Sequence, residues 1–194
     1  MTPAPIIFFA AIITNNILLA DFLGMCAFTA LSRNMRTAFG MGVAVTFVMS
    51  ITTVLNYLLY HHVLLPLGID FLSLIVFIVV IAGFVQLVEM IIERFVPVLY
   101  YTFGIYLPLI TVNCAILGAS LFMILREYGF WQSLAYGSGS GIGWTMVICA
   151  MAGIRRRLES ADIPPALKGL GMTMIVTALM AMAFMGFTGM VTIQ

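Results

Sequence analysis

The sequence predicts an all-α integral membrane protein with six transmembrane helices arranged as two inverted three-helix repeats. Composition is the first reason, because 63% of the 194 residues are hydrophobic, only 8% are charged and the mean hydropathy is +1.19. The second is a set of uncharged runs whose lengths suit the roughly 20 apolar residues that a membrane helix needs; they cover 37–69, 71–88, 95–125, 128–154 and 169–194. The third is an internal repeat, in which a cysteine precedes a basic residue, a Gly-x-Gly stretch and a threonine in each half.

The same composition limits the domain organisation and the function. Almost no polar sequence remains outside the apolar runs, so neither a soluble catalytic domain nor a nucleotide-binding domain is expected. A net charge of +1 does not indicate a nucleic-acid partner. We therefore expect one membrane domain over 1–194 surrounded by lipid, with the first repeat at 1–95 and the second at 96–194.

Segment lengths and helix breakers place the six helices in order along the chain. Their expected ranges are 6–31, 37–60, 69–93, 96–125, 130–154 and 167–191. The first contains polar residues and a glycine, namely Asn15, Asn16, Asp21 and Gly24. No Lys or Arg precedes it, so it is expected to be a broken membrane helix and not a cleaved signal peptide.

The fourth helix is the other one expected to be broken. It carries Gly104, Pro108 and Asn113, and because proline lacks a backbone donor and clashes with the preceding turn, we expect the break near Pro108. Unwound backbone at membrane depth is tolerated only where protein or a cavity covers it. The first and fourth helices should therefore face the protein interior. Small-residue faces for close helix packing are expected at Gly40, Gly42, Gly139, Gly141 and Gly143.

The distribution of Lys and Arg predicts the orientation in the membrane. With six helices, one side receives Arg33, Arg36, Arg94, Arg155, Arg156, Arg157 and Lys168, and the other receives only Arg126. The basic side should be cytoplasmic, which puts both termini on the periplasmic side of a bacterial inner membrane. The two halves then have opposite topology, and functional sites in such folds lie near the midplane on broken helices.

Cys26 and Cys114 occupy equivalent positions in the two halves and are the candidate metal ligands. Thiolates suit iron–sulfur clusters, zinc or copper, but a cluster usually needs four of them. A homologous second subunit would have to supply the other pair. The alternative is that both cysteines are small packing residues, which is also how we interpret Cys149 because it has no counterpart in the first half.

Two carboxylates within the apolar segments need separate interpretations. Glu89 follows eighteen uncharged residues, and intramembrane carboxylates are often functional, so it is the candidate for ion handling; an interfacial charge beside Glu93 and Arg94 is the alternative. Asp21 is either a buried, protonated group close to Cys26 or one that reaches a cavity. His61 and His62 are expected to be solvated in an outward loop.

Several long segments resemble one family of membrane proteins. They are FLGMCAFTALSR, QLVEMIIERFVPVLYYTFGIYLPLITVNCAI, YGSGSGIGW, AGIRRRL, DIPPALKGLG and ALMAMAFMGFTG. They are similar to the paired six-helix subunits shared by the sodium-translocating NADH:quinone reductase and the Rnf complex. The Thr-Val-Asn-Cys-Ala and GSGSGIGW motifs resemble E-type subunits of the quinone reductase more than A-type subunits of Rnf, which tend to have Cys-Pro-Phe where this chain has Cys26-Ala27-Phe28.

This resemblance implies a fold, a cofactor and partners. In the family, an E-type subunit and a homologous D-type subunit of opposite topology both contribute two cysteines to one intramembrane [2Fe–2S] cluster, which corresponds to Cys26 and Cys114 here. The cluster relays electrons from the NADH-oxidising flavin subunit toward covalent flavins. The resemblance also supports a role in sodium uptake for Glu89. The chain would thus belong to an NADH:quinone oxidoreductase without being catalytic alone.

Two other functional classes compete with this interpretation. A small secondary transporter or channel also uses inverted repeats with broken helices, but it should carry several ionisable groups at midplane, whereas here the polar groups cluster around the two cysteines. A structural scaffold within the pump would tolerate replacement of both cysteines.

Overall fold

The computed structural model describes residues 3–95, 107–158, 160 and 169–186, and every regular element in these ranges is a helix. The elements are α1 (Ala4–Ile12), α2 (Met25–Leu31), α3 (Met35–Leu59), η1 (Tyr60–Leu64), α4 (Leu65–Leu67), η2 (Asp70–Leu72), α5 (Ser73–Phe95), α7 (Leu107–Thr111), α8 (Cys114–Leu125), α9 (Phe130–Leu158) and α10 (Leu170–Met185).

Four stretches of these helices are long and apolar enough to cross a membrane. They are Met35–Leu67, Ser73–Ile91, Pro108–Leu125 and Phe130–Leu158, and α10 is a shorter apolar helix. The expectation of an all-α, multi-pass membrane protein is therefore confirmed. Parts of the expected fourth and sixth helices, at 96–106 and 187–191, lie outside the described residues, as do 167 and 168.

The two helices expected to be broken are both interrupted. The chain leaves α1 at Ile12 and resumes a helix only at Met25, with turns and bends between them. The second interruption, between α7 and α8, lies at Val112 and Asn113, shortly after Pro108. This break is associated with Asn113, whose side chain accepts a hydrogen bond from the Ala115 N–H at 3.0 Å and so caps α8.

The expected loop after the second helix is also helical. The chain continues from α3 through the π-helical turn η1 and α4 to Leu67, so His61 and His62 lie on a helix and not in a loop. The His61 ring stacks on Tyr57 with centroids 5.0 Å apart, and His62 Nδ1 lies 3.1 Å from the Leu58 carbonyl oxygen one turn earlier.

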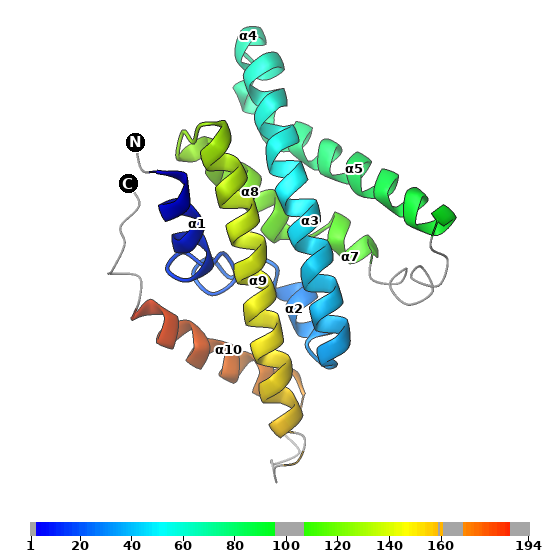
Figure 1. Ribbon diagram of the computed structural model, residues 1–194, viewed down its shortest axis with the longest axis vertical. Coiled ribbons are helices and arrows are strands. Elements are labelled where there is room, and N and C mark those ends of the chain that lie inside the picture. Colours follow the sequence, from blue (N-terminus) through cyan, green and yellow to red (C-terminus); the bar gives the residue numbers. More distant parts are fainter. Residues whose placement is uncertain (1–2, 96–106, 159, 161–168, 187–194) are drawn as a thin grey trace.

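An antiparallel pair of helices, α3 and α9, forms the centre of the fold (Figure 1). Their contact is close because glycine on one helix faces threonine on the other: Gly42 meets Thr145, and Gly141 meets Thr46. Between these contacts the Thr46 and Thr145 hydroxyl oxygens are 3.0 Å apart and share a hydrogen bond. The glycines of the expected small-residue faces thus allow the two backbones to approach.

A second row of glycines on α9 packs against α1. A Cβ on Gly139 would lie 2.7 Å from the Phe8 carbonyl oxygen, and one on Gly143 would lie 3.0 Å from the Ile12 carbonyl oxygen. Any side chain at these positions would push α1 away. The alternating glycines of α9 therefore place this helix between α1 and α3.

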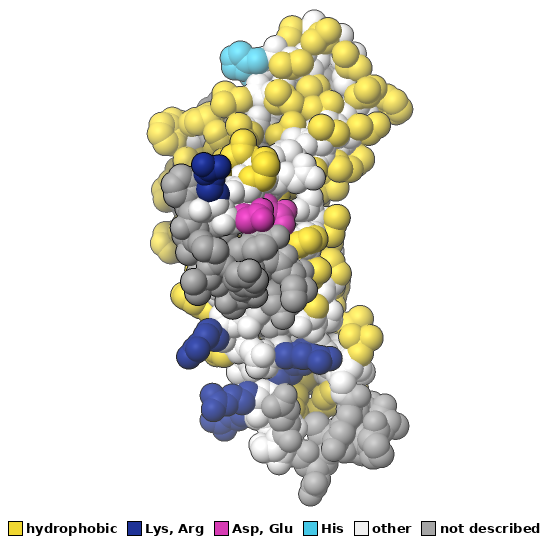
Figure 2. All heavy atoms as spheres, turned by 90° about the vertical axis from the view of Figure 1, so that its right-hand side faces the viewer, with side chains coloured by type: hydrophobic (Ala, Val, Ile, Leu, Met, Phe, Trp, Pro, Cys, Tyr) yellow, Lys and Arg dark blue, Asp and Glu magenta, His cyan; other side chains and the backbone are white. Residues whose placement is uncertain are grey.

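The remaining helices lie around this central pair (Figure 1). The short helices α1 and α7 lie on opposite sides of the α3–α9 pair. From the upper end of α3, α5 extends to the right of the view, whereas α10 extends from the lower end of α9 to the left. The exposed Lys and Arg side chains visible in Figure 2 gather mainly toward the lower end, where α3 begins and α9 ends.

Candidate functional site

The two candidate cysteines occupy the starts of two helices. Cys26 is the second residue of α2, and Cys114 is the first residue of α8. Both are free thiols; the Cys26 side chain is exposed and that of Cys114 is half-buried. Anionic sulfur is favoured at a helix N-terminus, because the unpaired backbone N–H groups there carry partial positive charge.

A backbone contact brings the two cysteine segments together. The Gly24 N–H donates to Cys114 Sγ across 2.9 Å, although the two residues are ninety positions apart. Gly24 directly precedes α2, so this contact fixes the start of the helix that carries Cys26 against the sulfur of the other cysteine. The structure therefore joins the two segments that the sequence repeat had paired.

Only glycine fits at this junction. Gly24 has φ of +84°, in the left-handed region. A Cβ there would lie 2.7 Å from Trp144 Nε1, 3.1 Å from Asn113 Oδ1 and 3.2 Å from Ala115 Cβ. Backbone conformation and neighbouring atoms thus both exclude a side chain, and the Gly24 N–H can approach the sulfur only because none is present.

Two buried donors lie beside this junction. Trp144 is fully buried and Asn113 is 2% exposed, yet neither Trp144 Nε1 nor Asn113 Nδ2 has a hydrogen-bond partner among the described residues. Buried N–H groups are rarely left without an acceptor. With the Gly24 N–H, they form a small cluster of N–H groups around the start of α8.

In the sequence, Gly24 and Asn113 stand out only as parts of the two broken helices and of the family motifs, and Trp144 only as part of a glycine-rich motif. Their positions around Cys114 depend on packing between segments far apart in the chain, so spacing alone gives no signal for them. The one signal in the sequence that could have drawn attention to Trp144 is its place directly after a glycine-rich stretch.

Within the described residues, no cluster of three or more His, Cys, Asp or Glu side chains could hold a metal ion alone. Two thiols are half of the set that an iron–sulfur cluster usually requires. Cys149 lies on α9, half-buried and packed against the apolar core, which agrees with its interpretation as a packing residue.

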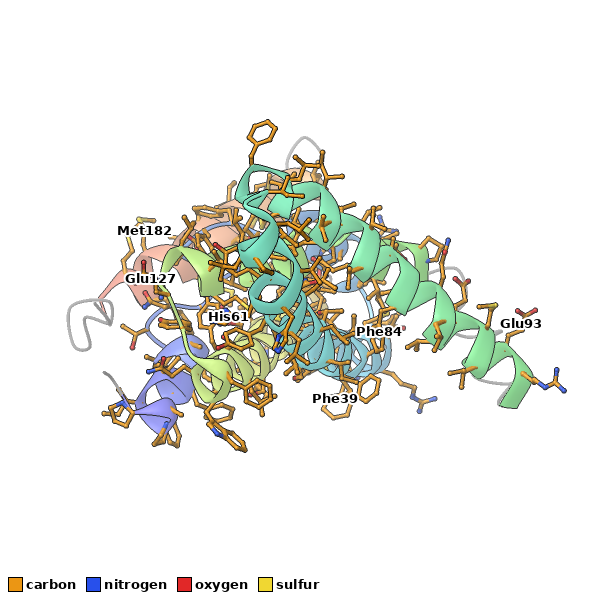
Figure 3. All side chains as sticks on the ribbon, turned by 90° about the horizontal axis from the view of Figure 1, so that it is seen from above. Phe39, His61, Phe84, Glu93, Glu127 and Met182 are labelled. Carbon is orange, nitrogen blue, oxygen red and sulfur yellow. The ribbon has the colours of Figure 1, made fainter. Side chains whose placement is uncertain are left out.

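The two carboxylates of interest lie in different surroundings. Glu89 is half-buried on α5, one turn before Glu93, whose side chain lies at the outer end of α5 in Figure 3. Asp21 lies between α1 and α2, and its side chain is exposed in the chain taken by itself. It lies near enough to Arg126 for electrostatic attraction, while the Arg126 guanidinium lies 5.7 Å from the centre of the Tyr136 ring.

Comparison with known proteins gives a consistent result. A family model described as "Rnf-Nqr subunit, membrane protein" matches residues 5–191. The chain is 51% identical over 189 residues to the E-type subunit of the Na(+)-translocating NADH-quinone reductase of Proteus mirabilis (strain HI4320), and 52% identical over 189 residues to that of Serratia proteamaculans (strain 568). It is 48% identical over 193 residues to the corresponding protein of Nitrosomonas europaea. All three alignments cover 94% of this chain and 96% of the relative.

Proposed function

The chain belongs to the Rnf-Nqr family of membrane subunits, and from this membership we propose that it is the E-type subunit of a Na+-translocating NADH-quinone reductase. It is a multi-pass membrane component of a bacterial respiratory oxidoreductase. In this proposal the subunit is not catalytic alone and acts within the complex. The three relatives are all E-type subunits of the quinone reductase by name, which favours this assignment over the A-type subunit of Rnf.

Within that complex, Cys26 and Cys114 supply two of the four thiolate ligands of an intramembrane [2Fe–2S] cluster. A homologous D-type subunit of opposite topology supplies the other two. The observation that carries this proposal is the 2.9 Å contact from the Gly24 N–H to Cys114 Sγ, because it brings the two cysteine segments to one place. The exposed Cys26 side chain leaves that place open toward a partner.

The residues present fit such a group. A [2Fe–2S] cluster with four thiolates is an anionic, sulfur-rich acceptor of hydrogen bonds. Trp144 Nε1 and Asn113 Nδ2 are buried donors without partners among the described residues, and the Gly24 N–H already donates to sulfur. Donors of this kind offset negative charge in a low-dielectric interior.

When bound, the cluster would accept and release single electrons. The chain's own residues hold and shield it: Cys26 and Cys114 bind, the Gly24 N–H orients the Cys114 sulfur, and buried side chains such as Trp144 and Ala115 keep water from the junction. The interruptions before α2 and α8 allow both thiols to lie at helix starts within the membrane.

The halves 1–95 and 96–194 are inverted repeats in this proposal. The reciprocal contacts of Gly42 with Thr145 and of Gly141 with Thr46 support it, since a two-fold axis between the threonines would exchange them. Both termini are then periplasmic, and the arginine-rich end where α3 begins and α9 ends is cytoplasmic. Glu89 on α5 serves sodium uptake from that side, with oxygen ligands completed by backbone or by other subunits.

The test is the iron and acid-labile sulfide content of the purified complex, with electron paramagnetic resonance of the reduced protein. We compare wild type with Cys26→Ala and Cys114→Ala, and use Cys149→Ala as the matched control. Both ligand variants should lose the same two irons and the same cluster signal, because each removes one of the four thiolates that such a cluster usually requires. Cys149→Ala should retain both.

Unchanged iron in either ligand variant would remove that cysteine from the ligand set. If electron transfer to quinone also persisted in both variants, the scaffold alternative would replace the relay. Sodium transport by the purified chain alone, with both cysteines replaced, would favour a secondary transporter.

A further inference from the structure

A basic cavity opens at the arginine-rich end of the α3–α9 pair. It has a volume of about 800 Å³ and is lined mainly by Arg33, Asn34, Met35, Gly153, Arg156 and Arg157. These residues come from the start of α3, the residues before it and the end of α9. The cavity is separate from the cysteine junction, and its arginines enter the proposed function only through the basic end that orients the chain.

The three arginines of the cavity differ from their neighbour Arg155. Arg155 Nη1 donates to the Thr29 carbonyl oxygen at 3.0 Å and to Ser32 Oγ at 2.7 Å, and so ties α9 to α2. Arg33, Arg156 and Arg157 have exposed side chains, and no acidic residue of the described chain lines the cavity with them. The described lining of the cavity thus carries three positive charges and no negative one.

The backbone adds to this charge. Asn34 is the N-cap residue of the 25-residue helix α3, and no side chain caps its first turn. The first N–H groups of a helix have no acceptor within it and carry partial positive charge. Asn34 and Met35 line the cavity, so the start of α3 and the arginines act on the same space. Guanidinium groups and helix N-termini both bind phosphate in proteins.

The size and position of the cavity identify the source of the phosphate. The cavity lies at the end of α3 and α9, both long and apolar enough to cross a membrane. The inference rests on the orientation in the proposed function, in which this end meets the cytoplasmic lipid headgroups. Its volume falls within the range of cavities that hold organic ligands and exceeds the need of a single free phosphate. Met35 and Ala152 provide apolar lining beside the arginines. We propose that this cavity binds the phosphate group of an anionic phospholipid headgroup.

Lipid binding to the delipidated, purified complex tests this proposal. The complex is titrated with phosphatidylglycerol in micelles that contain excess phosphatidylcholine, and bound lipid is measured by mass spectrometry. The test variant is Arg156→Gln with Arg157→Gln. The control is Arg36→Gln with Arg94→Gln, which removes the same charge from two exposed arginines outside the cavity.

The Kd for phosphatidylglycerol should rise about 20- to 30-fold in the test variant, as expected for the loss of two arginines at an anionic lipid. The control should change it less than about threefold, because solution ions screen charges that do not contact the lipid. Arg156→Lys with Arg157→Lys keeps the charge and should retain most of the binding, which separates lost charge from a damaged fold.

Three results would overturn the proposal. Equal weakening in test and control variants would mean diffuse attraction without a site. Displacement of the lipid by an equal concentration of inorganic phosphate would identify a free-phosphate site. Failure of the wild-type complex to prefer phosphatidylglycerol over phosphatidylcholine would mean that another protein chain or a free anion occupies the cavity.

Discussion

Helices α9 and α5 both have the length and composition to cross a membrane, yet they are buried to very different extents. Of their most hydrophobic stretches, 56% of α9 is buried within the chain but only 17% of α5. The order of hydropathy is the reverse, because α5 is the most hydrophobic of the four candidate spans and α9 the least. In lipid, apolar side chains do not drive helices together, so burial follows small residues and hydrogen bonds. The glycines and threonines of α9 identify it as a central helix, and the apolar surface of α5 is left for lipid or other subunits.

The largest effect is expected from Gly24→Ala, which introduces a side chain at the junction that Trp144 of α9 covers. The left-handed conformation costs an L-residue about 1–2 kcal/mol, and the Cβ would lie 2.7 Å from Trp144 Nε1. The Gly24 N–H should then move away from Cys114, and the complex should lose its cluster iron as completely as Cys114→Ala does. Iron content and electron paramagnetic resonance measure this loss.

Gly68→Ala is the matched control, since Gly68 also has positive φ, of +66°, but nothing lies within 4 Å of its Cβ position. It should keep the cluster despite the same backbone strain. Retention of iron in Gly24→Ala would mean that the contact with Cys114 does not position the ligand.

Gly141→Ala tests the close approach of α9 to α3 directly. The new methyl group would lie 2.7 Å from the Thr46 Cα atom, and overpacking of this kind typically costs about 1–3 kcal/mol. The amount of the protein in membranes and its thermal stability should both fall. Gly83→Ala on α5 is the control, because no atom lies within 4 Å of its Cβ position; it should stabilise the helix by about 1 kcal/mol. Equal losses in both variants would contradict the assignment of α9 as the central helix.

The features that could be predicted from the sequence are the local ones. Composition and uncharged runs correctly predicted an all-helical membrane chain, and the range expected for its second helix, 37–60, agrees with α3 at Met35–Leu59. The glycine faces were correctly predicted at Gly42, Gly139, Gly141 and Gly143, because Gly-x-Gly repeats on a helix have a direct steric meaning. These are local properties, which sequence spacing records.

Features that depend on distant segments were predicted less well. A break was expected near Pro108, but the sequence did not indicate that the Asn113 side chain caps α8 directly after the interruption. The contact of Gly24 with Cys114 joins residues ninety positions apart, and no local pattern encodes it. The roles of Cys26, Cys114 and Glu89 remain predictions, since the sites in which they would act are proposed to need ligands from other subunits.

Glu89→Gln tests whether the Glu89 carboxylate on α5, the more exposed of the two helices, takes part in sodium uptake. If Glu89 receives sodium, removing its charge should raise the sodium concentration for half-maximal quinone reductase activity about tenfold, which corresponds to about 1.4 kcal/mol. Glu93→Gln, one turn further along α5, is the control and should leave this concentration nearly unchanged. A shift of equal size in both variants would support the interfacial-charge alternative for Glu89.

The smallest effect is expected from Trp144→Phe, which removes one N–H donor from the cysteine junction and retains an aromatic ring. Hydrogen bonds to sulfur raise the reduction potential of an iron–sulfur cluster, so losing one should make the midpoint potential more negative. A hydrogen bond worth about 0.5–1.5 kcal/mol corresponds to roughly 20–65 mV for one electron. Trp131→Phe is the control, because Trp131 is 72% exposed on the same helix and should leave the potential unchanged. Redox titration by electron paramagnetic resonance measures both. An unshifted potential in Trp144→Phe, with iron content intact, would show that the Trp144 N–H does not act on the cluster and would leave the Gly24 N–H as the identified donor to sulfur.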